Sequence, residues 1–262
     1  MTGPKPRIIC STGSFWMWDL ERAMGALAKA GFTGAELMVT RDPRTQNAEV
    51  AASIAAKEGI EFVALHAPML VLTRRIWGPS FLPIIERSTE MAKKIGADVV
   101  IVHPPYIWEL KYQSWLLTRM DRYSAENQVA IAVENMFRLW VRGRAIRGHR
   151  WMSPADLKGF SQLTLDTSHC GVDDFDILEA LDLVGHQTAH VHLSDSRGDH
   201  RDNHLLPGTG GLPLKEFVSR LPEAGFRGNL SLELDLRSLV EDGVKLDDAL
   251  RKAKEFCEDA LA

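Results

Sequence analysis

Short apolar runs alternate with amphipathic stretches along most of this chain. Eight runs rich in β-branched and aliphatic residues predict strands, at roughly 7–12, 33–39, 60–66, 97–103, 129–135, 162–166, 187–194 and 229–235. Apolar residues at helical spacing predict helices between them, as in 19–31, 49–59, 81–96, 177–185 and 214–225. Several of these segments end in glycine, a common helix stop.

Eight such β-then-α units indicate an α/β protein with a single (β/α)8 TIM barrel that spans 1–262. The strand runs are almost continuously apolar, which is typical of a parallel sheet covered by helices. A linker rich in proline, serine or glycine does not divide the chain. A doubly wound open sheet is the alternative, but no GxGxxG fingerprint follows the first strand.

Composition places the chain among ordinary globular proteins, with 45% hydrophobic and 25% charged residues. No segment approaches the roughly 20 apolar residues of a membrane span, and MTGPKPRIIC lacks the apolar core of a secretion signal. We therefore expect a cytoplasmic protein without a membrane partner.

Cys10, Cys170 and Cys257 lie far apart and outside any CxxC spacing, so we expect reduced thiols. The net charge of -4 argues against an extended phosphate-binding surface and leaves room for one basic patch.

Acidic residues and histidines recur at the ends of the apolar runs. In a barrel, the loops that follow the strands meet at one face, so these side chains would converge. Buried carboxylates and imidazoles are costly unless a cation or a hydrogen-bond network compensates them. The residues are His66, His103, Glu134, Asp166, His169, His192, Asp202, His204 and Glu233.

The motifs that contain these residues resemble those of the xylose-isomerase-like barrels. This superfamily includes isomerases and epimerases of sugars and sugar phosphates, and also endonuclease IV. The resemblance runs through nearly the whole chain, in the order GFTGAELM, LHAP, HPP, AVENM, LDTSHCG, HVHLSDS, DNHLLPGTGGLPL and LSLELD.

The isomerase and epimerase branch implies one divalent cation, often manganese. Matching the motifs assigns its ligands to Glu134, Asp166, His192 and Glu233. This mostly oxygen-donor set suits Mn²⁺, Mg²⁺ or Co²⁺, and zinc is also compatible. The resemblance further implies that His169 contacts substrate oxygens, and Arg197 resembles a substrate-binding arginine of the branch.

The expected reaction is proton transfer at a carbon next to a carbonyl. A cation would stabilise the negative charge that develops on oxygen, and Glu134 and Glu233 would serve as base and acid. The sequence thus predicts a metal-dependent isomerase or epimerase whose substrate is a small sugar or sugar phosphate. A dehydratase or lyase is an alternative, because removal of the same proton can expel a β-hydroxyl group. A further alternative is a barrel that has lost its chemistry and only binds a ligand or a partner.

Endonuclease IV suggests a second function, zinc-dependent cleavage of abasic DNA. Its three-zinc pattern is matched by adding His66, His103, His169, Asp202 and His204 to the four ligands above. The segment STGSFWMW and the motif HPPY depart from the nuclease pattern, so nucleic acid is not the expected partner. If they bind no metal, the added residues would bind substrate or order the loops.

Several loop residues are further candidates for substrate binding. Trp16 and Trp108 follow the first and fourth strands. Their indole rings could pack against a sugar ring or form part of a contact between subunits. The segment FRLWVRGRAIRGHRWMS, with Arg138, Arg142, Arg144, Arg147 and Arg150, predicts a long loop that is either solvated or binds an anion. PGTGG at 207–211 could offer backbone N–H groups to phosphate or form a tight turn. Subunit number stays open, with a homo-oligomer among the options.

Overall fold

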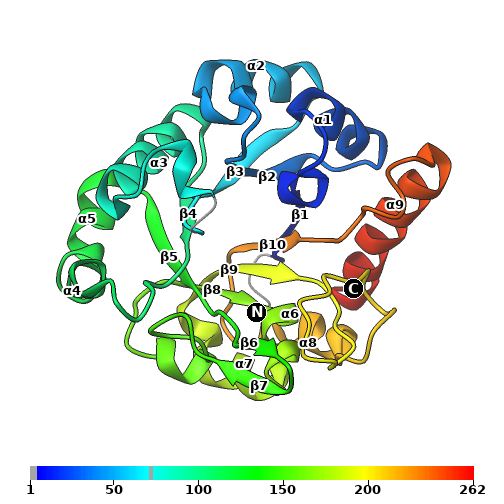
Figure 1. Cartoon of the computed structure of the whole chain (residues 1–262). Coiled ribbons are helices and arrows are strands. Elements are labelled where there is room, and N and C mark those ends of the chain that lie inside the picture. Colours follow the sequence, from blue (N-terminus) through cyan, green and yellow to red (C-terminus); the bar gives the residue numbers. More distant parts are fainter. Residues whose placement is uncertain (1–4, 71–72) are drawn as a thin grey trace.

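Eight parallel strands form a closed barrel in the computed structural model, which describes residues 5–70 and 73–262 (Figure 1). This confirms the predicted TIM barrel. The strands are β1 (Arg7–Ser11), β2 (Gly34–Met38), β3 (Glu61–His66), β4 (Val99–Val102), β5 (Ala130–Glu134), β8 (Leu163–Asp166), β9 (Thr188–Leu193) and β10 (Asn229–Leu232).

Each barrel strand pairs with the next barrel strand along the chain, so that β5 pairs with β8. The cylinder closes where β10 pairs with β1, with Arg7 beside Asn229. All the pairings are parallel, so the carboxyl ends of the strands lie at one end of the barrel. The residues at those ends are therefore brought together by strand register.

Helices form a ring outside the strands (Figure 1). They are α1 (Leu20–Lys29), α2 (Ala48–Lys57), α3 (Phe81–Ile95), α4 (Leu110–Thr118), α5 (Met120–Asn127), α6 (Thr167–Val172), α7 (Ile177–Val184), α8 (Leu214–Arg220) and α9 (Gly243–Ala260). Short 3-10 turns are η1 (Thr12–Phe15), η2 (Pro43–Gln46), η3 (Arg74–Ile76), η4 (Pro154–Leu157) and η5 (Gly185–Gln187). Among the described residues, no helix has both the length and the apolar composition needed to cross a bilayer.

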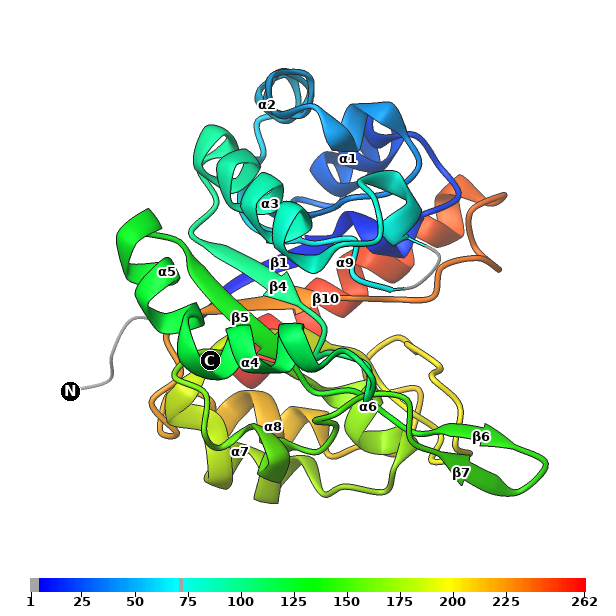
Figure 2. The same ribbon diagram turned by 60° about the vertical axis from the view of Figure 1, so that its left-hand side comes forward.

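The fifth unit departs from the regular pattern, because residues 135–162 contain a hairpin and η4 in place of an α-helix. The hairpin is formed by β6 (Leu139–Val141) and β7 (Arg144–Ile146), and it projects from the barrel (Figure 2). The arginine-rich segment thus contains a β-hairpin where the sequence predicted a long loop. Arg142 and Gly143 both have positive φ, 50° and 72°, which is the backbone of a tight two-residue hairpin turn.

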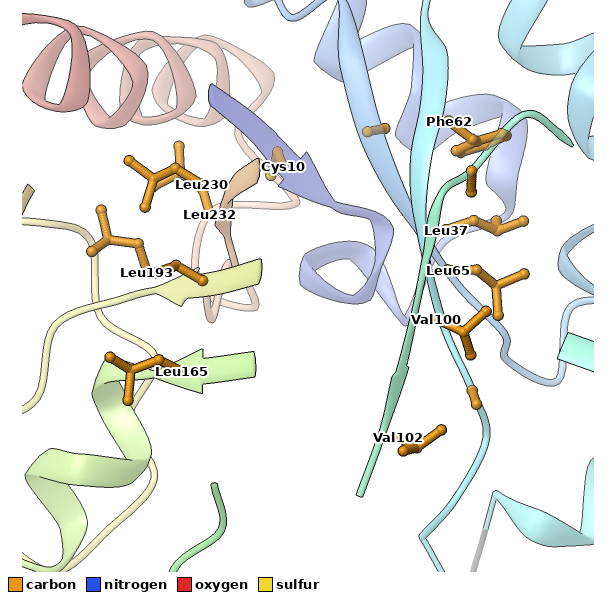
Figure 3. Packing of buried hydrophobic residues seen from close by; sticks show 14 of the residues in the cluster. Cys10, Leu37, Phe62, Leu65, Val100, Val102, Leu165, Leu193, Leu230 and Leu232 are labelled. Atoms are coloured by element: carbon orange, nitrogen blue, oxygen red, sulfur yellow. The ribbon is translucent and has the colours of Figure 1, made fainter. Parts of the chain in front are cut away.

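The main apolar core lies between the barrel and its helices. Side chains such as Leu37, Leu65, Val100, Leu165 and Leu193 point outward from their strands (Figure 3). Each buried aliphatic side chain of this size contributes about 1.5–3 kcal/mol through removal from water. Because side chains alternate along a strand, the intervening residues point into the barrel.

The barrel interior holds a second and smaller apolar cluster. It consists of Ile9, Ala64, Val99, Ile101 and Ala132. The remaining inward positions are largely polar, which is unusual for a barrel interior normally filled by branched apolar side chains. The polar residues extend from the middle of the barrel to the ends of the strands, where the site lies.

Candidate metal centre and substrate cavity

The predicted ligands come from consecutive barrel strands. Glu134 and Asp166 are the last residues of β5 and β8, His192 lies in β9, and Glu233 directly follows β10. Each of the four offers one ligand atom, and these atoms all lie within 4.8 Å of one another. We call these four residues the donor cage.

His192 lies at the centre of the donor cage. Its Nδ1 atom is 2.9 Å from Oε1 of Glu134, 3.0 Å from Oε2 of Glu233 and 3.7 Å from Oδ2 of Asp166. His192 and Asp166 are fully buried, and Glu134 is almost so. Three carboxylates around one imidazole nitrogen repel one another unless positive charge lies between them.

Two carboxylate oxygens in the cage lack hydrogen bonds from the described residues. They are Oε2 of Glu134 and Oδ2 of Asp166, and both are buried. The other oxygen of Asp166 accepts the backbone N–H of His169 at 2.8 Å, which fixes the side chain at the start of α6. Buried oxygens without donors are costly, and a divalent cation would satisfy them. The donor cage therefore fits a metal ion.

Five further candidates flank the donor cage on two sides. On one side, Nε2 of His103 and Nε2 of His66 lie 3.0 and 3.4 Å from Oε2 of Glu134. On the other, Oδ2 of Asp202 lies 2.9 Å from Nε2 of His204 and 3.6 Å from Nε2 of His169. The chain thus brings together all nine donors expected from its sequence.

Hydrogen bonds to backbone carbonyls orient three of these histidines. Nδ1 of His66, His169 and His204 lies 3.1, 2.8 and 3.1 Å from the carbonyl oxygens of Ala67, Asn135 and Glu233, respectively. A carbonyl only accepts hydrogen bonds, so each Nδ1 carries a proton. In the neutral ring, Nε2 then presents a lone pair to a carboxylate, an arrangement common in metal-binding histidines.

The pKa shifts reflect the same excess of negative charge. Burial lowers the pKa of His192, but Glu233, Glu36 and Glu134 outweigh it and hold that pKa well above its usual value. Burial raises the pKa of Glu134, but the charge of His192 and the close approach of the His103 and His66 imidazoles bring it well below the usual range. For His204, burial is outweighed by Asp202, which raises the pKa to about 10. The carboxylates therefore attract positive charge, whether a proton or a metal ion.

A fully buried acidic residue next to the donor cage was not among the candidates from the sequence. Glu36, in the middle of β2, is fully buried and accepts hydrogen bonds from Ser11, His190 and His192. The sequence search considered the ends of the apolar runs, whereas Glu36 lies inside one. Its signal was an acidic residue at an inward position of the apolar run GAELM.

Two adjoining cavities border the donor cage. The smaller, about 180 Å³, is lined by His66, His103, Glu134, His169 and Glu233, among others. The larger, about 720 Å³, shares Asp202, His204 and Glu233 with it. Trp16, Ile76, Arg41 and Arg237 line the larger cavity but not the smaller one, and Leu70 lines both. Its volume is in the range of small-molecule binding sites.

Other predicted binding residues lie elsewhere. Trp108 is exposed and stacks on Tyr106, with ring centroids 4.9 Å apart, and it does not line either cavity. Arg197 is exposed and lines a separate cavity of about 340 Å³ beside Asp174 and Phe175. The structure therefore does not bring Trp108 or Arg197 to the donor cage.

Parts of the two predicted anion-binding segments are engaged within the chain, whereas Arg142, Arg144 and Arg150 are exposed. Arg138 binds Asp173 through both its backbone N–H and its guanidinium, and Arg147 lies 3.4 Å from Asp156. In the PGTGG segment, the N–H groups of Gly208 and Gly210 donate to Asp195 at 3.0 and 2.9 Å. An internal carboxylate thus takes up these N–H groups, which favours the tight-turn interpretation.

A closed parallel barrel with polar groups at the carboxyl ends of its strands defines a TIM-barrel protein. The family model described as xylose isomerase-like TIM barrel matches residues 24–259, and the chain belongs to that family. The uncharacterized protein ML2432 of Mycobacterium leprae is 30% identical over 275 residues, which cover 97% of this chain and 98% of ML2432.

Two solved structures illustrate the similarity of fold. A D-tagatose 3-epimerase-like protein has a TM-score of 0.69 and 22% identity, covering 98% of this chain and 100% of that one. The 3-keto-D-glucoside 4-epimerase YcjR from E. coli has a TM-score of 0.71 and 18% identity, with 96% and 100% covered. At this level of identity, the similarity establishes the fold.

Proposed function

We propose that this protein is a divalent-metal-dependent isomerase or epimerase of a sugar or sugar phosphate. The observation that carries the proposal is the donor cage, with Glu134, Asp166, His192 and Glu233 gathered beside a sugar-sized cavity. The epimerase names of structures with the same fold support the reaction class. Mn²⁺ is the expected cation, and the donor set also suits Mg²⁺, Co²⁺ or Zn²⁺.

The two glutamates are the groups proposed to move the proton. Both line the smaller cavity, and the side chain of Glu233 is 16% exposed whereas that of Glu134 is 1% exposed. A cation, when bound, stabilises the negative charge that develops on substrate oxygens during proton removal. One glutamate removes the proton from the carbon next to the carbonyl, and the other returns a proton, either there or at the neighbouring carbon.

The surrounding residues are suited to orient a polyhydroxylated substrate. His169 lines the smaller cavity, close enough to Asp202 and Glu134 to direct a substrate hydroxyl toward the cage. Trp16, Leu70 and Ile76 give the larger cavity an apolar wall, which could pack against the C–H face of a sugar.

The proposal is tested by deuterium incorporation. The Mn²⁺-loaded protein is incubated in D2O with a panel of ketopentoses, ketohexoses and their phosphates, and products are examined by NMR. We expect deuterium at a carbon next to the carbonyl, together with an epimer or aldose product. Full metal loading without exchange in any member of the panel would contradict the proposal. Loss of water from a substrate would instead indicate a dehydratase.

A second candidate function is metal-dependent phosphodiester cleavage, as in endonuclease IV. It is favoured by the flanking donors, because the group of His66, His103 and Glu134 shares Glu134 with the cage. The group of Asp166, His169 and His204 likewise shares Asp166. Two or three zinc ions per chain, with incision of a duplex containing one abasic site, would support this candidate. A single cation per chain without incision would exclude it.

A further inference from the structure

Below the donor cage, the barrel contains a buried carboxylate that the proposed reaction does not use. Glu36 has no exposed surface, and its Oε1 accepts the hydroxyl of Ser11 at 2.8 Å. Its Oε2 lies 2.8 Å from Nε2 of His190 and 3.0 Å from Nε2 of His192. These three partners are also fully buried.

Among the described residues, the ion-pair partners of Glu36 are the imidazoles of His190 and His192. No described lysine or arginine lies within ion-pair distance of its carboxylate. A buried carboxylate is maintained only where hydrogen bonds or nearby positive charge compensate it. Three donors converge on Glu36, so its two oxygens are well satisfied. A cation bound one imidazole away would supply the remaining compensation.

The hydrogen bonds to Glu36 determine which nitrogen of His192 is free. An ionised carboxylate can only accept, so the Nε2 atom of His192 carries the proton that it donates. In the neutral ring, Nδ1 then holds a lone pair, and this atom lies 2.9 and 3.0 Å from carboxylate oxygens of Glu134 and Glu233. In a neutral ring, the Nδ1 lone pair would face two carboxylate oxygens, which repel it. The same orientation is favourable when a cation lies between the lone pair and the carboxylates.

We propose that Glu36 is a positioning residue that holds His192 as an Nδ1 metal ligand by accepting its Nε2 proton. The proposal rests on the metal site of the proposed function. Carboxylates that accept the second N–H of a metal-bound histidine fix its tautomer and ring orientation and increase its basicity. Glu36 does this from β2, which contributes none of the four residues of the donor cage.

The charge and the hydrogen bonds of Glu36 can be separated by two substitutions. In E36Q, the amide oxygen can still accept from His192 while the amide N–H₂ turns toward Ser11, so mainly the charge is lost. In E36M, which has similar volume, the buried Nε2 of His192 loses its acceptor. S11A is the matched control, because it removes a hydrogen bond from the other oxygen of Glu36.

Mn²⁺ affinity is measured from the EPR signal of the free ion, and thermal unfolding is recorded with and without Mn²⁺. We expect E36Q to weaken binding by roughly 10- to 100-fold, E36M to weaken it further, and S11A to stay within about threefold of the original protein. E36Q affinity within about threefold of the original would overturn the proposal. Stability losses of equal size with and without Mn²⁺ would indicate a purely structural role and would also overturn it.

The tautomer can be observed without altering Glu36. The ¹⁵N-histidine NMR spectrum of the Zn²⁺-loaded protein should show the His192 ring protonated at Nε2, with the signal assigned by its loss in H192Q. Protonation at Nδ1 would contradict the proposal even if the Glu36 variants fail to fold. A protein that binds no divalent cation would refute both this inference and the proposed function. Metal binding that depends on Glu36, without sugar isomerisation, would refute only the function.

Discussion

Asp166 and His192 are directly paired across β8 and β9, and Oδ2 of Asp166 lies 3.7 Å from Nδ1 of His192. Both side chains point inward from hydrogen-bonded strands, so their separation is set by the register of the barrel. The neighbouring pair, Ser231 of β10 with His192, fixes the approach of Glu233 in the same way. The cage is thus built on rigid elements, as expected for groups that must keep a fixed geometry.

Replacing Glu233 by glutamine should abolish turnover while preserving the fold. Glutamine has nearly the same shape but cannot take up a proton, and it is a weaker metal ligand. We expect kcat on the substrate identified by deuterium exchange to fall by a factor of about 10³ or more. Circular dichroism and the unfolding midpoint should change little.

E134Q should also lose turnover, with a larger loss of metal content. Within the cage, Glu134 contacts His192, and outside it Glu134 contacts the imidazoles of His66 and His103. The substitution therefore disturbs more neighbours. E216Q, on the outer helix α8, is a control that should behave like the original protein. Near-normal turnover in E233Q or E134Q would exclude that residue from the proton transfer.

The number of bound metal ions should separate the two candidate functions. For an isomerase with one cation in the donor cage, H204N should retain about one ion per chain, because His204 lies outside the cage. For a phosphodiesterase with flanking ions, the same substitution should release one of them. Elemental analysis after removal of free metal gives the number of ions per chain in each case. H186N, at an exposed position in η5, is a control.

The barrel and the clustering of most candidate donors could be predicted from the sequence, because both depend on local patterns. An apolar run with a polar end indicates a parallel strand, and parallel strands bring their ends together, so Glu134, Asp166 and His192 converge. Glu36 was missed because its importance depends on His190, a partner on a non-adjacent strand of the barrel at a sequence separation of 154. No local pattern reveals such a contact.

The hairpin of β6 and β7 was missed for the opposite reason. Its strands are three residues each and largely exposed, so no alternation of buried and solvated positions marks them. The available signal was the pair Arg142–Gly143 between two short apolar runs, which is weaker than the usual Asn-Gly or Asp-Gly turn. The placement of Arg197 and Trp108 depends on loop conformation, which sequence patterns do not determine.

Arg41 should influence the preference for charged substrates. It lines the larger cavity, is exposed, and makes no ion pair with another described residue, whereas Arg237 on the same cavity is paired with Asp235. An unpaired guanidinium can bind a phosphate or carboxylate group of the substrate. In R41A we expect KM for a phosphorylated substrate to rise about 10-fold or more while KM for its unphosphorylated counterpart stays within about twofold. R237A serves as the comparison, and equal effects on both substrates would contradict this role.

Stability should fall at alkaline pH because the folded chain keeps its thiols protonated. Burial raises the pKa of Cys257 on α9 to about 12, and it raises the pKa values of Cys10 and Cys170 in the same direction. Unfolded thiols titrate near pH 8.5. Between these values the unfolded chain releases protons that the folded chain retains, so rising pH favours unfolding. Each thiol should reduce the free energy of unfolding by roughly 1.4 kcal/mol per pH unit above about pH 9, and have no such effect at lower pH.

Other groups titrate in this range, so the contribution of Cys257 is isolated by comparison with C257A. Urea unfolding under reducing conditions, from pH 8 to pH 11, should give a shallower decline for C257A even though its stability at pH 8 is lower because of the cavity. A thiol reagent at pH 8 should label the native protein slowly and label three thiols after unfolding, since all three cysteines are buried. Identical pH slopes in the two proteins, or rapid labelling of native Cys257, would show that this thiol is more accessible than its burial in α9 implies.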